Sequence, residues 1–488
     1  MKPLDWVVIA IYMVGMLAVG EYYARRNRNT EDYLLGGRRM SSLAVGLSLF
    51  ASLMSTNTYL SMPGEMIQHG PVAFAKVLMY PVAFLIGAYA LIPFLMRLDV
   101  TSAYQILEKR FGLSIRLLCS TIFLVSRLLW MGLILYGLVG KVLLPIMGLP
   151  DWITPYACGL MGLITVIYTS VGGLRAVVAT DVIQSFILFG GAILVILVIT
   201  VSLGGVSNSW PTTWPEHWDT FEIGLNREAR FTLVTACLSQ LVWWICTSGS
   251  DQMAIQRYLA TKNLYTARQV LGVSLIASFF TLILLALVGL CLLSYFQAHP
   301  DLAGELSVSD NSAATLFPHF IVIGLPQGIT GLVIAGILAA AMSSLSSGFN
   351  SGSLVISVDF FDRLGWGPRD EAHRIRRTKN IAWTVGLLTV ASSMLVGYIP
   401  GDLLTINYKT SNLLVVPLFI PFFMAFFVPW STTFGTWVGT LASIISAVGI
   451  AFYEVFNLSI AWIMPVSLVV GIVVGCIASI VSIGPRPD

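Results

Sequence analysis

Small hydroxyl side chains gather in three segments that are otherwise apolar. Segment 50–66 reads FASLMSTNTYLSMPGEM, in which serine, threonine and asparagine precede Pro63 and Gly64. Segment 243–257 contains TSGSDQ, and segment 339–353 contains SSLSS. Hydroxyl and carbonyl oxygens are the ligands that hard cations prefer, and proline interrupts a helix and frees its carbonyls. The three segments therefore predict a cation site, provided that the fold brings them together.

Each segment also has a purely structural explanation. Serine and threonine in a helix can bond to the carbonyl of the preceding turn, and small residues let membrane helices pack closely. Asp181 lies in another apolar stretch, where an unpartnered carboxylate would take up a proton. Either a nearby cation or an ion pair with Arg175 or another loop arginine would keep it charged, and the sequence leaves both explanations open.

The elements that would position these segments are membrane-spanning helices. Hydrophobic residues make up 57% of the 488 residues and charged residues 10%, whereas a soluble domain carries roughly 25% charged residues. Apolar runs of about 20 residues cross a hydrocarbon core of ~30 Å, and they must be helical because lipid offers the backbone no partner. Hydropathy predicts about 13 spans, at 4–24, 44–66, 71–96, 115–143, 152–170, 177–203, 230–250, 268–297, 325–352, 380–398, 402–426, 432–453 and 459–483.

The first two hydroxyl-rich segments fall in the second and seventh predicted spans, five spans apart. This separation is expected for two inverted five-helix repeats, each led by a broken helix. The predicted fold class is therefore an all-α polytopic membrane protein with a five-plus-five inverted repeat. Its expected parts are an N-terminal helix and cytoplasmic loop (1–43), a first repeat (44–203), an external loop (204–229), a second repeat (230–426) and two C-terminal helices (427–488).

Basic residues predict the orientation, because they favour the cytoplasmic loops of membrane proteins. About 20 of them lie in alternate loops, within 25–39, 97–116, 175, 257–268 and 363–379. The opposite loops hold only Lys2, Lys141, Arg227 and Arg230. The chain is thus expected to be multi-pass in the plasma membrane, with its N-terminus outside and its C-terminus inside.

Five segments together resemble the sodium/solute symporter family, which carries sugars, proline, pantothenate, iodide, monocarboxylates and sialic acids. They are FASLMSTNTYLSMPG (50–64), TSAYQILEKRFG (101–112), YTSVGGLRAVVATDVIQ (168–184), DQMAIQRYLATKNLYTAR (251–268) and AAAMSSLSS (339–347). The resemblance covers most of the chain. It implies a LeuT-like fold and sodium-driven transport by alternating access.

The resemblance also implies which residues bind sodium, the expected cofactor. A first sodium would be held by the backbone carbonyls of Ala51, Met54 and Ala340 and by the hydroxyls of Ser343 and Ser344. Some members of the family hold a second sodium nearer the cytoplasm. At those positions this chain has Asp181, Ser346 and Ser347, with Ser343 shared. One or two sodium ions are therefore expected.

The solute is expected at mid-membrane beside the first sodium. Candidate wall residues are Ser55, Thr58, Trp243, Trp244, Thr247, Tyr408 and Asn412. Two cations in predicted spans, Arg127 and Lys76, favour an organic anion such as a sialic acid or a monocarboxylate, since a guanidinium suits a carboxylate. The alternatives are that Arg127 pairs with Asp181 or Glu65 or snorkels inward, and that Lys76 snorkels outward.

Other function classes are less well supported by the residues. The five histidines lie in loops or at span ends, and no HExxH motif or Ser/His pair of an intramembrane protease is present, so an enzyme is not expected. A net charge of +3 does not indicate nucleic-acid binding. The expected function is sodium-coupled import of a small organic anion, with the lipid bilayer, sodium and the solute as partners. The alternatives are a neutral solute such as a sugar or amino acid, or an uncoupled uniporter or sensor.

Overall fold

The computed structural model describes residues 1–24, 30–97, 100–310, 312–367, 370–396, 398–399 and 403–483. Regular structure in these ranges is helical, without strands. The first half contains α1 (Pro3–Ala24), α2 (Thr30–Leu35), α3 (Ser42–Leu53), α4 (Thr56–His69), η2 (Val72–Met79), α5 (Tyr80–Ile86), α6 (Ile92–Met96), α7 (Tyr104–Phe111), α8 (Leu113–Leu138), α9 (Leu144–Met147) and α10 (Thr154–Ser202). The second half contains α11 (Leu233–Ser250), α12 (Gln252–Leu259), α13 (Leu264–Ala298), α14 (Ala313–Ile323), α15 (Ile329–Val355), η8 (Ile356–Asp362), α16 (Glu371–Val396), α17 (Leu403–Thr410), α18 (Val415–Phe427), α19 (Thr433–Tyr453) and α20 (Ile463–Ile483).

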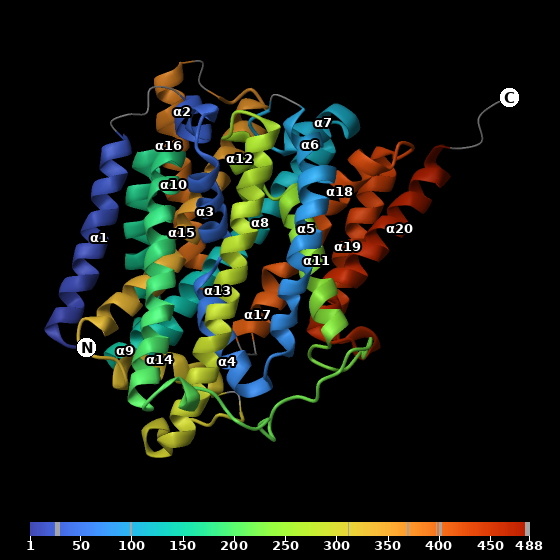
Figure 1. Cartoon of the computed structure of the whole chain (residues 1–488). Coiled ribbons are helices and arrows are strands. Elements are labelled where there is room, and N and C mark those ends of the chain that lie inside the picture. Colours follow the sequence, from blue (N-terminus) through green and yellow to red (C-terminus); the bar gives the residue numbers. More distant parts are fainter. Residues whose placement is uncertain are drawn as a thin grey trace.

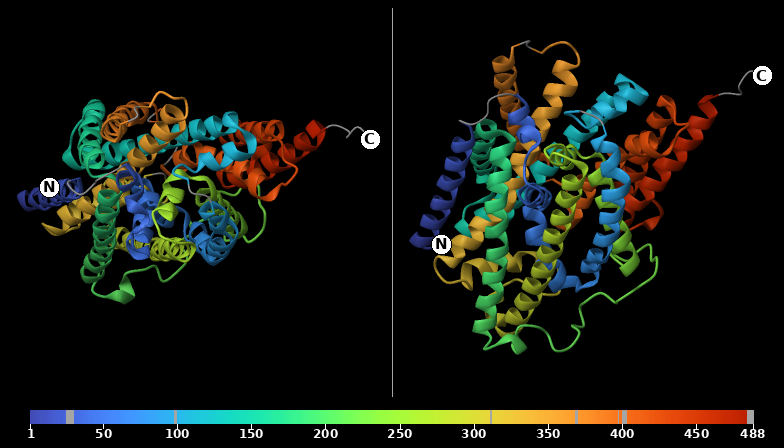
Figure 2. Two further views of the ribbon diagram at one scale, coloured as in Figure 1. Left: turned by 90° about the horizontal axis from the view of Figure 1, so that it is seen from above. Right: turned by 45° about the horizontal axis from the view of Figure 1, so that its top comes forward.

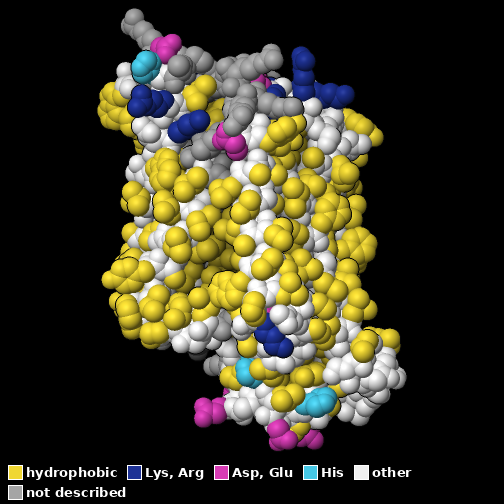
Figure 3. All heavy atoms as spheres, turned by 90° about the vertical axis from the view of Figure 1, so that its left-hand side faces the viewer, with side chains coloured by type: hydrophobic (Ala, Val, Ile, Leu, Met, Phe, Trp, Pro, Cys, Tyr) yellow, Lys and Arg dark blue, Asp and Glu magenta, His cyan; other side chains and the backbone are white. Residues whose placement is uncertain are grey.

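These helices form one bundle, in which α1 lies at one edge and α19 and α20 lie at the opposite edge (Figures 1 and 2). The helices that carry the hydroxyl-rich segments, α3, α4 and α15, lie between these edges. A band of hydrophobic side chains surrounds the middle of the molecule, and charged side chains gather above and below it (Figure 3). Leu387 and Ile445, for example, are each 71% exposed. Such a belt matches the hydrocarbon core of a bilayer.

The predicted number of spans is only partly supported. In the described ranges, 11 helical segments are long and apolar enough to cross a membrane, or 12 if the bent pair α3 and α4 counts as one span. The fifth predicted span, 152–170, lies in the first part of α10, before its kink at Gly173, where Thr154–Ile167 is identified only as a shorter apolar helix. The count of 13 is therefore not confirmed. Arg25, Arg26, Arg28 and Arg369, which contribute to the predicted orientation, lie outside the described residues.

The break in the second predicted span is confirmed, but its cause differs from the one expected. The axes of α3 and α4 differ by 66°, and the chain is extended at Met54 and Ser55. The hydroxyl of Ser55 caps α4 by accepting the N–H of Thr58 at 3.2 Å. Helix α4 then continues through Pro63 and Gly64. Gly64 serves packing instead, because a Cβ there would lie 2.6 Å from Cα of Ala314 in α14.

The second break lies at Asp251, directly after the TSGS sequence that predicted it. Helix α11 runs through Ser250, the backbone is extended at Asp251, and the carboxylate of Asp251 caps α12 by accepting the N–H of Met253 at 2.8 Å. Gly249 allows α11 to approach α18, since a Cβ there would lie 2.6 Å from the ring of Phe419. Both breaks are thus held by a polar side chain at the start of the second helical piece.

Candidate functional site

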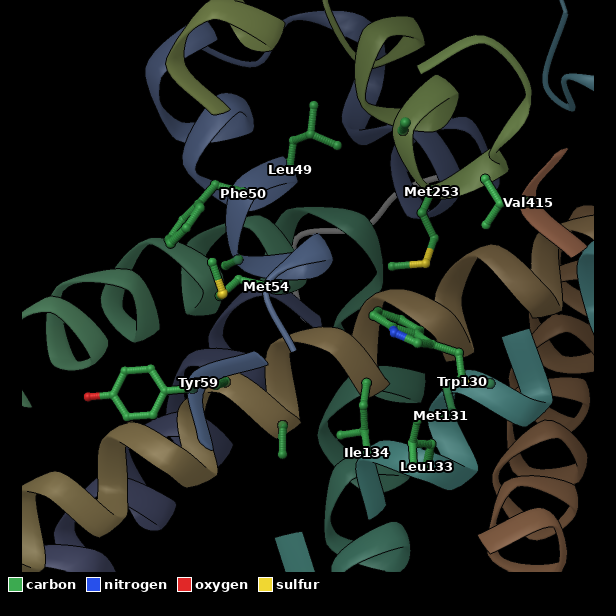
Figure 4. Close-up of a cluster of buried hydrophobic side chains, with 14 of the residues drawn as sticks. Leu49, Phe50, Met54, Tyr59, Trp130, Met131, Leu133, Ile134, Met253 and Val415 are labelled. Atoms are coloured by element: carbon green, nitrogen blue, oxygen red, sulfur yellow. The ribbon is translucent and has the colours of Figure 1, made fainter. Parts of the chain in front are cut away.

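The break between α3 and α4 leaves backbone carbonyls without helical partners. The last four carbonyls of any helix lack an intrahelical N–H, and they carry the negative end of the helix dipole. At the end of α3 these groups are buried among hydrophobic side chains, including Leu49, Phe50, Met54 and Tyr59 (Figure 4). Buried carbonyls need partners, and here the partners come from α15.

Two serine hydroxyls of α15 lie against these carbonyls. The Oγ of Ser343 lies 2.9 Å from the carbonyl oxygen of Ala51 and 3.1 Å from that of Ala340. The Oγ of Ser344 lies 3.3 Å from the carbonyl oxygen of Met54. The structure therefore brings together all five groups that the family resemblance implies for the first sodium. These hydroxyls retain oxygen lone pairs that could face a cation.

The residues predicted for a second sodium are arranged differently. Two of them, Asp181 and Ser347, lie beside a buried guanidinium, that of Arg257 in α12, which is 0% exposed. Its Nη2 donates to the hydroxyls of Ser52 and Ser347 at 2.5 and 2.6 Å, and it lies 3.5 Å from Oδ2 of Asp181. The hydroxyl of Ser346 instead donates to the carbonyl of Ser343 at 3.0 Å.

Arg257 also bears on two expectations. The pattern of basic residues assigns it to a cytoplasmic loop, yet it lies in α12, a helix that begins within the bundle. The sequence allows Asp181 an ion pair with Arg175 or another loop arginine, and the structure pairs it with Arg257, whereas Arg175 pairs with Asp32 at 2.7 Å. The position of Arg257 six residues after the polar break at Asp251 was the sequence signal for its burial.

A cavity of about 120 Å³ adjoins the break between α3 and α4. All the predicted wall residues line it except Thr247, which is buried elsewhere and whose carbonyl accepts the N–H of Asp251. Sequence reasoning missed the hydrogen-bonding side chains of Tyr80, Gln240, Asn407 and Ser411 on the same wall. The complete lining is Leu53, Met54, Ser55, Thr58, Met62, Lys76, Tyr80, Arg127, Trp130, Gln240, Trp243, Trp244, Ser278, Leu282, Leu404, Asn407, Tyr408, Ser411, Asn412, Val415 and Met464.

Arg127 is neutralised by a partner that the sequence did not indicate. Its Nη2 lies 2.6 Å from Oδ2 of Asp251, so neither Asp181 nor Glu65 pairs with it. Its guanidinium carbon also lies 4.8 Å from the ring centre of Trp130, in a cation–π arrangement. Arg127 thus ties α8 to the break between α11 and α12 at the edge of the cavity.

Lys76 also departs from expectation. Its side chain lines the cavity, and its Nζ lies 3.2 Å from the sulfur of Met62, a residue that is 0% exposed. The ammonium therefore points into the bundle instead of snorkelling outward. Glu65, the acidic residue whose charge acts on Lys76, is bound through both carboxylate oxygens by Arg230, at 3.0 and 2.9 Å.

Comparisons with known proteins identify the family of the chain. The model of the sodium:solute symporter family matches residues 33–443. The sodium/sialic acid symporter SiaT of Proteus mirabilis is 30% identical over 407 residues, which cover 79% of this chain and 77% of that protein. Human sodium-coupled monocarboxylate transporter 1 is 30% identical over 362 residues, which cover 73% of this chain but only 58% of that protein.

A solved structure extends the likeness to the whole chain. The substrate-bound, outward-open structure of a Na+-coupled sialic acid symporter matches with a TM-score of 0.82 and 27% identity, over 98% of both chains. The matched family segment includes both helix breaks, the serines of α15 and all but one of the residues that line the cavity. This chain therefore belongs to the sodium:solute symporter family of multi-pass membrane transporters.

Proposed function

We propose that the protein couples the inward movement of sodium to the uptake of a small organic anion. The observation that carries the proposal is the contact between α15 and the break beside the cavity. Met54 belongs to both features, because its carbonyl faces the hydroxyl of Ser344 and its residue lines the cavity. A sodium ion bound by Ala51, Met54, Ala340, Ser343 and Ser344 would therefore sit next to the solute.

This arrangement explains how the two ligands would be coupled. Sodium would join α15 to the end of α3, and the same break supplies Ser55 and Thr58 to the cavity. If sodium orders the break, each ligand raises the affinity for the other by the same factor. A negative-inside potential adds about 2.3 kcal/mol per 100 mV for each charge moved inward.

We propose a single sodium at this first site. Asp181 and Ser347 already contact Arg257, whose charge replaces that of a second ion. The number of sodium ions per solute can be measured from the solute gradient that a known sodium gradient sustains in proteoliposomes. A coupling ratio of one is expected, and a ratio of two would favour a second sodium at Asp181, Ser346 and Ser347.

The membrane arrangement that fits this function has the N-terminus outside and the C-terminus inside the plasma membrane. Helix α1 begins towards the end of the bundle opposite to that where α20 ends (Figure 1), as this arrangement requires. Residues 44–203 and 230–426 would be the two inverted repeats, with their broken helices meeting at the sites. Tagging each terminus in intact cells and testing its access to a protease would check the orientation.

The test of the function is a solute screen with purified protein. Sialic acid, short monocarboxylates, sugars and amino acids are added with and without sodium, and the melting temperature and the uptake into proteoliposomes are measured. Carboxylates are expected to stabilise the protein and to accumulate only with sodium. Uptake that does not depend on sodium would reject the coupling, and sodium-dependent uptake of sugars or amino acids alone would favour a neutral solute.

A further inference from the structure

Among the described residues, two cationic side chains line the cavity, and only one of them has a carboxylate partner there. Arg127 is paired with Asp251 at 2.6 Å. The ammonium of Lys76 contacts the sulfur of Met62 at 3.2 Å, and no carboxylate of the described ranges lies within 4 Å of it. A thioether is a weak acceptor, whereas an ammonium has three N–H donors. The ammonium of Lys76 therefore has N–H donors that could bind a ligand in the cavity.

The neighbouring carboxylate cannot supply the missing partner without breaking a better contact. Glu65 is 5% exposed and receives two hydrogen bonds from Arg230. Such a paired arrangement of guanidinium and carboxylate is among the strongest side-chain contacts. A charged group placed at membrane depth is unfavourable unless it is paired or solvated, so an anion that enters the cavity would gain directly from Lys76.

The other residues that line the cavity indicate the size and polarity of the solute. The rings of Tyr80, Trp243 and Trp244 line the cavity together with amides such as Asn412. Its volume of about 120 Å³ is close to that of the roughly 150 Å³ protein cavity that binds benzene. This space suits a compact acid with an apolar body, and it is small for a nine-carbon sugar acid.

We propose that the ammonium of Lys76 binds the carboxylate of a compact monocarboxylate solute, and that Arg127 has a positioning role. This inference rests on the proposed function and names the residue that would select the charge of the solute. Because Lys76 belongs to η2, it would also tie the solute to the segment that follows α4 directly in the chain.

The experiment compares acids with their neutral amides, which have almost the same shape. The pairs are benzoate with benzamide and butanoate with butanamide. The binding strength of each compound is measured from the sodium-dependent rise in melting temperature of the purified, full-length protein. The wild type is expected to bind each acid roughly ten- to a hundredfold more tightly than its amide, as for a hydrogen bond to a charged group. N-acetylneuraminate is included as the large acid.

The variant Lys76→Met removes the charge and should abolish the preference for acid over amide. Lys76→Arg keeps a cation and should retain the preference. The matched control is Lys409→Met, the same change in α17, a helix whose Leu404, Asn407 and Tyr408 line the cavity while Lys409 does not. A sodium-induced rise in melting temperature without solute shows that each variant is folded.

The outcomes separate this inference from the proposed function. If no solute stabilises the wild type in a sodium-dependent manner, the proposed function fails. If sodium-dependent binding occurs but acids and amides bind equally, or if Lys76→Met keeps the preference, the role of Lys76 is wrong. If Lys76→Met does not fold, the wild-type preference and Lys76→Arg decide. Tighter binding of N-acetylneuraminate than of both small acids would overturn the compact solute.

Discussion

The guanidinium of Arg257 lies 3.5 Å from Oδ2 of Asp181, and their side chains are 1% and 0% exposed. The hydroxyl of Ser48 donates to Oδ2 of Asp181 at 2.5 Å and accepts from Nε of Arg257 at 3.0 Å. A buried ion pair is held by such additional hydrogen bonds, because the attraction alone does not repay desolvation. This pair joins α10 to α12 next to the serines of α15.

Removal of one member of this pair should be much more harmful than removal of both. Arg257→Met leaves the buried carboxylate of Asp181 uncompensated, which typically costs about 3–5 kcal/mol. The double variant Asp181→Asn with Arg257→Met should recover a large part of that loss. Chemical or thermal unfolding in detergent measures the stability of the wild type, of Arg257→Met, of Asp181→Asn and of the double variant. Additive losses would show that the two residues do not act as a pair.

Loss of either serine hydroxyl at the break should weaken the response to sodium. For Ser343→Ala and Ser344→Ala we expect the sodium concentration for half-maximal uptake to rise about tenfold or more, as when a buried carbonyl loses its partner and the ion loses a ligand. Ser353→Ala is the matched control, because its hydroxyl bonds within α15 to the carbonyl of Asn350 at 2.9 Å. Equal sodium dependence in all three variants would exclude the first site.

Arg127 should affect stability more than solute selection. Arg127→Met leaves Asp251 as an unpaired buried charge, and a loss of about 3 kcal/mol in the free energy of unfolding is expected. The uptake that remains should still favour acids over amides, since Lys76 is intact. A competition assay between benzoate and benzamide checks this. If the variant is stable but no longer prefers benzoate over benzamide, Arg127 binds the carboxylate of the solute.

Glu108 links α7 to α8 and to the end of η8, at the rim of the bundle. It accepts from Arg116 and Arg363 at 2.5 and 2.6 Å. Burial opposes its charge, but these hydrogen bonds and the two positive charges hold the pKa of Glu108 below its usual 4.5. Its contribution to stability is therefore present above pH 4.5 and is lost as the pH falls through the lowered pKa.

Melting temperatures between pH 7 and pH 3 test this link. Glu108→Gln should lower the melting temperature at pH 7, and its difference from the wild type should shrink in acid. Glu305→Gln, an exposed position in the segment that follows α13, is the matched control. A constant difference between Glu108→Gln and the wild type at every pH would show that the carboxylate charge does not contribute.

The class of the protein can be read from the sequence, and the resemblance of its segments predicts the groups of the first site. Membrane spans are visible because each must offer lipid a continuous apolar run, which is a local property. Both breaks were visible for a similar reason, since polar residues rarely occur within such runs without a role. The carbonyls of Ala51 and Met54 were placed by the resemblance of the segment around them, and their neighbours in α15 by another such segment.

The direction and the partner of each buried charge could not be assigned from the sequence. Arg127 meets Asp251, and Asp181 meets Arg257, across helices that are far apart in the sequence. The residues next to Lys76 in the sequence do not indicate whether its side chain points to the lipid headgroups or into the cavity. The strength of an ion pair depends on distance and on exclusion of water. Both are set by how the helices pack, and no local pattern of residues specifies them.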